Sequence, residues 1–143
     1  MAARNVHSET VRVWRESWAG AGPLSQEVLV HLYERALDAL WRRAHMSLGE
    51  ITLMAIVDRV LHTGTEKFPH LAALKVETSG VQFVGLRLAA AGVDPVLLDE
   101  SLAFLVVELL RVFGTLTGEI LTPGLHAELS KVRVPPTAEK GGT

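Results

Sequence analysis

Residues 96–121 are apolar on nearly every side of the helix that they would form, and this feature constrains the fold most strongly. Beyond Asp99 and Glu100 in its first turns, a narrow polar strip through Glu108, Arg111 and Glu119 interrupts the apolar surface. These charges keep the uninterrupted run well below the roughly 20 apolar residues that a membrane-spanning helix needs. The segment therefore predicts a helix that other helices cover on most faces, without insertion into a membrane.

Capping residues mark where two of the expected helices begin. Asp94 precedes a proline at the favoured first helical position, so the long helix is expected over residues 95–121. Ser25 follows a break that contains glycine and proline, and it opens a helix over residues 25–45. The apolar residues of this second helix fall on two adjacent tracks, which is typical of a helix that faces a core.

A third helix start is expected at residues 47–50, whose sequence SLGE matches the capping box. Met46 and Ile51 occupy the positions of the hydrophobic staple that accompanies such a box. We expect a helix over residues 48–68, which the following proline ends. Because almost no loop separates it from residues 25–45, the two helices should form an antiparallel pair.

The N-terminal segment is expected to hold a short helical arm. Ser8 can cap a helix over residues 8–19, and the apolar stripe of this helix consists of Val11, Trp14 and Trp18. We expect residues 1–7, which precede the cap, to be disordered.

The C-terminal segment repeats the combination of a cap and a proline at Thr122. It predicts a terminal helix over residues 122–132 with Leu125 and Leu129 on one face. Residues 134–143 carry no apolar pattern, and we expect them to be disordered.

Residues 75–84 allow two interpretations. Residues 78–80 (TSG) lie between Val76 and Phe83, which is the pattern of a hairpin turn. Residues 79–82 (SGVQ) also match a second capping box, which would open a helix that closes after the following run of alanines. We favour the helix.

Together these segments predict an all-α fold, a four-helix-bundle-like single domain over residues 1–143 with a short N-terminal helical arm and a short C-terminal helix. The chain contains no cysteine, which excludes disulfide scaffolds and thiolate metal sites. Its net charge is −2 and its longest basic run is Arg42–Arg43, so it disfavours binding to nucleic acid. No basic segment followed by an apolar run begins the chain, and we expect a cytoplasmic location.

Six histidines call for a test of metal and haem binding. None follows a carboxylate residue by three positions, so the Glu-x-x-His pairs of di-iron bundles are missing. Asp58, His62 and Glu66 share one helical face, with His70 just beyond them. They form either a solvated polar face or a mixed nitrogen and oxygen ligand set. We favour the solvated face, keep His62 and Glu66 as candidate metal ligands, and expect no cofactor.

His45 is a second candidate site. Ala44, His45 and Gly49 resemble the motif of histidine phosphotransfer domains, four-helix bundles in which an exposed histidine receives a phosphoryl group. The lysine that this family carries before the glycine is Leu48 here, which removes the cation that would steady the phosphate. The resemblance spans residues 44–49 and implies phosphoryl relay through His45 as an alternative function.

The remaining polar and aromatic residues favour structural roles. His31 lies at the margin of a core stripe, where we expect it to be partly buried, and His126 has no neighbour that suggests a site. Aromatic residues could line a pocket for a flat ligand, although at helical spacing they more often pack a core. The Glu108–Arg111 pair is either an intramolecular ion pair or a contact across a dimer axis.

Surplus hydrophobicity without a catalytic constellation leads to the functional expectation. Apolar residues make up 48% of the chain, more than a small water-soluble monomer usually carries. We expect a non-enzymatic regulatory or adaptor module that binds another protein and forms a homodimer through its long helix. The alternatives are phosphoryl relay through His45 and a bundle that binds a small molecule or a metal. The expected dimer interface consists of Leu98, Leu102, Leu105, Leu109, Val112 and Leu116.

Overall fold

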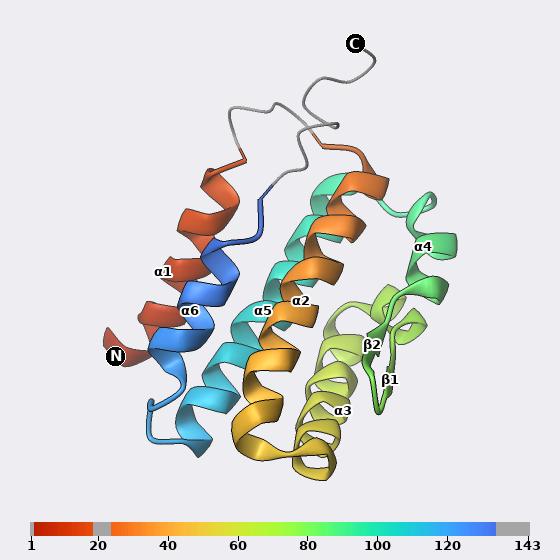
Figure 1. Cartoon of the computed structure of the whole chain (residues 1–143). Helices are drawn as coiled ribbons and strands as arrows, with labels where there is room; N and C mark the ends of the chain where they lie inside the picture. Colours follow the sequence, from red (N-terminus) through yellow and green to blue (C-terminus); the bar gives the residue numbers. More distant parts are fainter. Residues whose placement is uncertain (1, 19–23, 134–143) are drawn as a thin grey trace.

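The structure is a computed structural model that describes residues 2–18 and 24–133, with side chains from residue 6 onward. The described residues form six α-helices, one 3-10 helix and two short strands. In chain order these elements are α1 (Ala2–Glu16), α2 (Gln26–Leu48), α3 (Glu50–Lys67), η2 (Pro69–Ala73), β1 (Lys75–Glu77), β2 (Gly80–Gln82), α4 (Val84–Ala90), α5 (Pro95–Leu116) and α6 (Thr122–Ser130). Helices dominate, and the predicted all-α class is confirmed (Figure 1).

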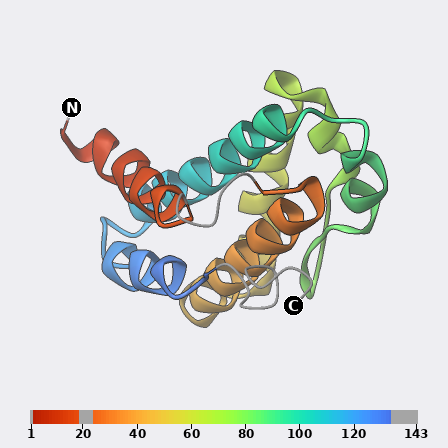
Figure 2. The same ribbon diagram turned by 90° about the horizontal axis from the view of Figure 1, so that it is seen from above.

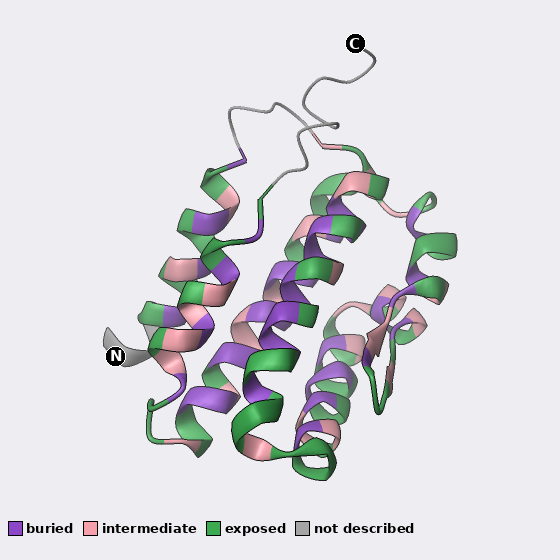
Figure 3. Ribbon diagram, viewed as in Figure 1, coloured by how far each residue is buried: buried purple, intermediate pink, exposed green. Residues whose placement is uncertain are grey.

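The long helices lie side by side, with α2 and α5 in the middle of the molecule (Figures 1 and 2). Helix α3 packs against both of them on one side, and α1 and α6 cover the other side. The β1–β2 ribbon contacts α2 and α3, and α4 contacts α2. Buried residues line the inward faces of the helices (Figure 3), and all six helices contribute to one hydrophobic core cluster.

Helix α1 begins at Ala2, earlier than the predicted start at Ser8. The expected disorder of residues 1–7 is therefore wrong for residues 2–7, and residue 1 lies outside the described ranges. His7 lies one turn before Val11 on the predicted apolar stripe and is only 3% exposed. Because the buried stripe extends to His7, the helix gains packing that a start at Ser8 would forgo.

A single residue, Gly49, joins α2 to α3, and the predicted capping box is wrong. Helix α2 runs past Ser47, and the Gly49 amide donates to the carbonyl of His45 at 3.1 Å. Met46 and Ile51 are 80% and 84% exposed, so they form no staple. Gly49 has a φ of +81°, in the region that favours glycine, and it closes α2 without a serine cap. The two helices form the predicted antiparallel pair (Figure 1).

Residues 75–82 form a β-hairpin, so the favoured capping box at residues 79–82 is wrong, whereas the helix that was expected to close at the alanine run is present as α4 and begins only at Val84. Strand β1 pairs antiparallel with β2, and Val76 lies opposite Val81. Gly80 follows the two-residue turn with a φ of +129°, a conformation that few other residues adopt. Both valines pack against the core, so burial of the ribbon on α2 and α3 outweighs the local capping signal.

Two features of α5 and α6 follow their sequence patterns. The Asp94 carboxylate accepts a hydrogen bond from the amide of Val96 at 2.9 Å, as predicted for a helix cap. Leu125 and Leu129 of α6 share a fully buried face. The expectation for residues 134–143 falls outside the described residues.

Helix α5 ends at Leu116 rather than near Leu121. Gly118 and Glu119 follow with φ angles of +60° and +68°, and two consecutive left-handed residues end a right-handed helix. Thr122 does not cap α6, because its hydroxyl donates to the Glu119 carboxylate instead. The turn directs the Glu119 side chain back over the end of α5, where its carboxylate lies against Gly114.

Candidate functional site

The expected dimer face of α5 is covered by the chain's own helices α1, α2 and α3. Four of its residues are at most 4% exposed, namely Leu98, Leu102, Leu105 and Leu109. Val112 is half-buried, whereas Leu116 is 59% exposed. Side chains that form the core of one chain cannot also bind a second chain, so the predicted interface is corrected at these four leucines.

Both histidines of α2 are exposed. His45 lies in the last turn of the helix, one turn before Gly49. His31 is also exposed, which corrects the expectation of partial burial. Its neighbours Val30 and Leu32 are buried, so they take the inward-facing positions and leave His31 on the outer side.

His62 and Glu66 lie side by side on the surface of α3, with His62 Nε2 3.4 Å from Glu66 Oε2. Their side chains are 76% and 69% exposed. His70 turns away from them, because its Nε2 lies 2.7 Å from Oγ of the buried Ser101, and burial lowers the pKa of His70. Within residues 2–18 and 24–133 no three potential ligands gather to hold a metal ion. The pair therefore has the geometry of a solvated polar face.

The polar strip of α5 forms a local ion pair. Arg111 Nη2 donates to Glu108 Oε1 at 2.6 Å within the helix. This hydrogen bond raises the pKa of Arg111. The intramolecular alternative is thus the one present, and solvent screening at this exposed position leaves it little effect on stability.

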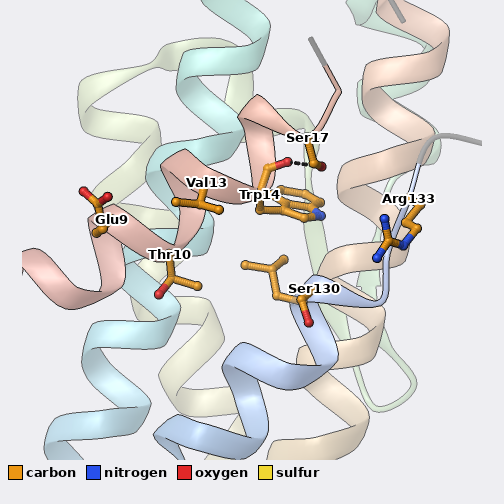
Figure 4. A pocket seen from close by; sticks show the side chains of 8 residues that line it. Glu9, Thr10, Val13, Trp14, Ser17, Ser130 and Arg133 are labelled. Carbon is orange, nitrogen blue, oxygen red and sulfur yellow. Dashed lines mark hydrogen bonds between the residues drawn. The ribbon is translucent and has the colours of Figure 1, made fainter. Parts of the chain in front are cut away.

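A groove of about 340 Å³ lies between α1 and α6 (Figure 4). Its apolar lining comes from Val13, Trp14 and Leu129. We call this feature the α1–α6 groove. Its volume is at the lower end for ligand pockets, so it suits one or two large apolar side chains. Its polar rim consists of Glu9, Thr10, Ser17, Ser130 and Arg133.

Trp14 is a fixed part of the groove wall. Its Nε1 donates to the backbone carbonyl of Val132 at 2.8 Å. Its ring meets Trp18 and Tyr33 edge to face, with ring centroids 4.8 and 5.3 Å apart. Because α1 contacts α6 through Trp14 and Val132 near one end and through two histidines near the other, the two helices run in the same direction.

Asp99 of α5 supports this wall from behind. It accepts hydrogen bonds from the Tyr33 hydroxyl at 2.6 Å and from Arg15 Nη2 at 2.7 Å. Burial, and then the neighbouring Asp99 carboxylate, raise the pKa of Tyr33 well above its usual value. Tyr33 therefore stays a neutral donor, and three elements are held in one arrangement behind Trp14.

The two serine hydroxyls at the groove rim donate hydrogen bonds to backbone carbonyls. Ser17 Oγ donates to the carbonyl of Trp14 at 2.5 Å, and Ser130 Oγ donates to the carbonyl of Ala127 at 2.9 Å. A hydroxyl that donates to a carbonyl has no base to activate it, so neither serine is arranged as a nucleophile.

Charge on the groove rim is uneven. The Glu9 carboxylate is bonded to Arg12 and points away from Trp14 (Figure 4). Arg133 instead turns its guanidinium toward the hollow (Figure 4). Among the described residues no carboxylate oxygen lies within 4.0 Å of the Arg133 nitrogens. The inner rim therefore presents a positive charge.

A histidine pair, of which His7 is buried and His126 is half-buried, joins α1 to α6 beside the groove. Nδ1 of His7 lies 3.0 Å from Nε2 of His126, and the two rings meet edge to face. On one side of the pair, Nδ1 of His126 lies 3.2 Å from Oγ1 of Thr10. On the other side, Nε2 of His7 lies 3.5 Å from Oε1 of Glu119. These four residues form a polar row from the groove rim to the turn before α6.

The carboxylate of Glu119 sets the direction of hydrogen bonding in this row. A carboxylate only accepts, so the arrangement that satisfies every contact has the His7 proton on Nε2, facing Glu119, and lets Nδ1 of His7 accept from Nε2 of His126. Nδ1 of His126 then accepts from the Thr10 hydroxyl. Burial, and then proximity to His7, lower the pKa of His126, which Glu119 partly opposes. The row thus favours neutral His126.

Sequence reasoning missed both the groove and the histidine pair. His7 and His126 are 119 positions apart, so local spacing cannot associate them. One signal was available, because His7 falls on the apolar stripe one turn before Val11 and a histidine on such a stripe needs a buried partner.

No family model, curated protein or solved structure matches the chain. In the described part of the chain, no helix combines the length and the hydropathy needed to cross a bilayer. Function is therefore inferred from the α1–α6 groove and the residues around it.

Proposed function

We propose that the chain is a non-enzymatic regulatory or adaptor module that binds another protein, and that the α1–α6 groove receives a helix of that partner. The observation that carries this proposal is the apolar hollow between two parallel helices. An amphipathic helix buries its apolar face in such a hollow, with anchor side chains spaced three and four residues apart. Tryptophan and arginine, both present here, dominate the energetics of many protein interfaces.

The charge on the rim indicates what the partner helix carries. Arg133 faces the hollow without a described carboxylate partner, while Glu9 is occupied by Arg12. A partner helix with a large apolar side chain and an adjacent acidic residue would fill the hollow and pair with Arg133. Such a pair adds specificity, because a basic helix would meet repulsion at the same place.

Screening of a phage-displayed library of helical peptides, randomised on one face, tests the proposal. We expect enrichment of peptides with large apolar residues next to Asp or Glu. Val13 is 53% exposed, so Val13→Glu leaves the core intact while it places a charge in the groove. We expect it to weaken the enriched peptides by about tenfold or more.

Val96→Glu is the matched control, because Val96 is 66% exposed and does not line the groove. Binding that survives Val13→Glu, or that Val96→Glu abolishes equally, would place the site elsewhere and contradict the proposal. Enrichment of basic rather than acidic peptides would contradict the assigned role of Arg133. A screen that enriches no peptide would overturn helix binding, and a small apolar ligand would then be the occupant to test.

Phosphoryl relay is the second candidate, favoured by the exposure of His45 on a long helix of the bundle. Incubation with a phosphorylated receiver domain would label the chain at His45. His31→Gln is the matched control, because His31 is exposed on the same helix. Labelling that His45→Gln leaves unchanged would exclude this function.

A further inference from the structure

The histidine pair and the α1–α6 groove share one residue, Thr10. Its hydroxyl lies 3.2 Å from His126, and its side chain also lines the groove. Glu9 and Val13, on the same helix, form the adjacent wall. Any change that separates His7 from His126 therefore changes the groove.

Only one proton fits between the two facing nitrogens, Nδ1 of His7 and Nε2 of His126. Two ring nitrogens 3.0 Å apart require one donor and one acceptor. If both rings are protonated, two N–H groups point at each other and two positive charges meet in a site where His7 is 3% exposed. The contact is then repulsive rather than bonding.

The surroundings of the pair supply one carboxylate, that of Glu119, so they can neutralise one imidazolium but not two. From the turn before α6, Glu119 approaches His7 on the nitrogen that faces away from His126. From α1, the described neighbour is the uncharged Thr10. From α2, Arg43 places its guanidinium against Gly124 of α6, where it adds positive charge. On α5, Arg111 is paired with Glu108 within its own helix.

The backbone at Glu119 supplies an independent sign of a constrained contact. A glutamate with a φ of +68° adopts a conformation that costs energy for any residue with a side chain. Its carboxylate is held there by Thr122 and His7. Loss of the His7 contact removes part of what keeps this turn in place.

We infer that the His7–His126 pair makes the α1–α6 groove acid-sensitive, because a second proton breaks the contact and loosens the first half of α1. The second half stays anchored through the Trp14 bond to Val132 and the Arg15 bond to Asp99. The part of the groove wall that precedes Trp14 thus moves, while Trp14 itself stays in place. This inference rests on the proposed function for the identity of the ligand, whereas the movement of α1 needs no partner.

Hydrogen exchange of α1 amides at pH 7.5 and 5.5, corrected for intrinsic rates, tests the movement. We expect the opening equilibrium before Trp14 to rise by up to about tenfold per pH unit below about pH 6.5, with little change in α2. We expect His126→Gln to remove this pH response, because glutamine gains no proton. His70→Gln is the matched control, since His70 is also partly buried but belongs to η2.

Thr10→Val removes the hydroxyl next to His126 and leaves both histidines in place. Circular dichroism shows whether His126→Gln folds, and Thr10→Val supplies the test if it does not. It leaves the imidazole pair in place, so the acid response of α1 should persist. Exchange before Trp14 that does not depend on pH, an unchanged response in a folded His126→Gln, or a response lost in Thr10→Val would each overturn the inference.

Binding of the enriched helical peptides at both pH values separates the two proposals. Opening of α1 in acid together with weaker peptide binding supports the inference in full. Opening of α1 with no peptide binding at either pH leaves the proton-sensitive contact standing and overturns the docking proposal. Opening with equal binding at both pH values overturns the link between the pair and the groove.

Discussion

The indole nitrogen of Trp14 donates a hydrogen bond to the backbone carbonyl of Val132, across 2.8 Å and 118 positions of sequence. This bond ties the groove wall on α1 to the segment after α6. The neighbouring Trp18 makes no such bond. Its Nε1 is buried and has no hydrogen-bond partner among the described residues. The two tryptophans share one stripe and differ in hydrogen bonding, which makes them a matched pair.

Trp14→Phe should destabilise the chain more than Trp18→Phe. The first change leaves the Val132 carbonyl unpaired at a cost of about 1–3 kcal/mol beyond the lost packing. The second removes an unpaired donor, which offsets part of the lost packing. Urea unfolding of both variants measures the difference, and equal losses would show that the Trp14 bond contributes nothing.

Leu105→Ala should lower the free energy of unfolding by about 2–5 kcal/mol without a change in oligomeric state. Leu105 is fully buried, and α3 approaches it so closely that a Cβ at Gly64 would lie 2.8 Å from its Cδ2. Leu116→Ala, at the exposed end of α5, should change stability by less than about 0.5 kcal/mol. Light scattering of both variants decides the matter, because a dimer that Leu105→Ala dissociates would restore α5 as an interface. A homodimer through another face stays a prediction.

Alkaline pH should unfold the chain through Tyr33, its single tyrosine. The pKa of Tyr33 is raised in the folded state, so above the unfolded value of about 10 the folded chain binds more protons than the unfolded chain. Stability is therefore complete below pH 10 and falls as the pH rises beyond it. Absorbance at the tyrosinate band should appear together with loss of helical circular dichroism. Tyrosinate that forms while the helices persist would contradict the assigned environment, and Tyr33→Phe should remove this part of the pH dependence.

Gly118→Ala should cost about 1–2 kcal/mol through the backbone alone. Gly118 has a φ of +60°, and a Cβ there would meet no atom within 4 Å. Gly92 has no positive φ, and its added Cβ would make an ordinary contact 3.7 Å from the Ala89 carbonyl oxygen. Gly92→Ala should therefore be neutral or stabilise by about 0.4–1 kcal/mol. The midpoint of thermal unfolding should fall for Gly118→Ala and stay unchanged or rise for Gly92→Ala, and an equal fall in both variants would refute this account of the turn.

The elements that the sequence predicts well are those governed by local signals. The Asp94 cap, the antiparallel α2–α3 pair and the buried face of α6 each depend on residues within a turn or two of one another. The capping box failed because Gly49 offered a competing way to end α2 at the same place. The hairpin was missed because Val76 and Val81 gain more from the core than a cap would supply.

The candidate site depends on distant residues, and sequence spacing cannot reveal it. The groove and the histidine pair both arise where α1 meets α6. The predicted surface of α5 was assigned by hydrophobicity alone, which does not distinguish a helix covered by its own chain from one covered by a partner. Packing of α1, α2 and α3 on α5 decided that question.

The parallel course of α1 and α6 has a mechanical consequence. Residue 2 lies at the start of α1, and residue 133 lies beyond the opposite end of the parallel helix α6. A force that pulls these two residues apart therefore slides the two helices past each other in opposite directions. The Trp14–Val132 and His7–His126 contacts then bear the load together in shear, whereas antiparallel neighbours would peel apart one contact at a time. The helices α2, α3 and α5 bear no load until these two contacts break. Acid would lower the force at which they break.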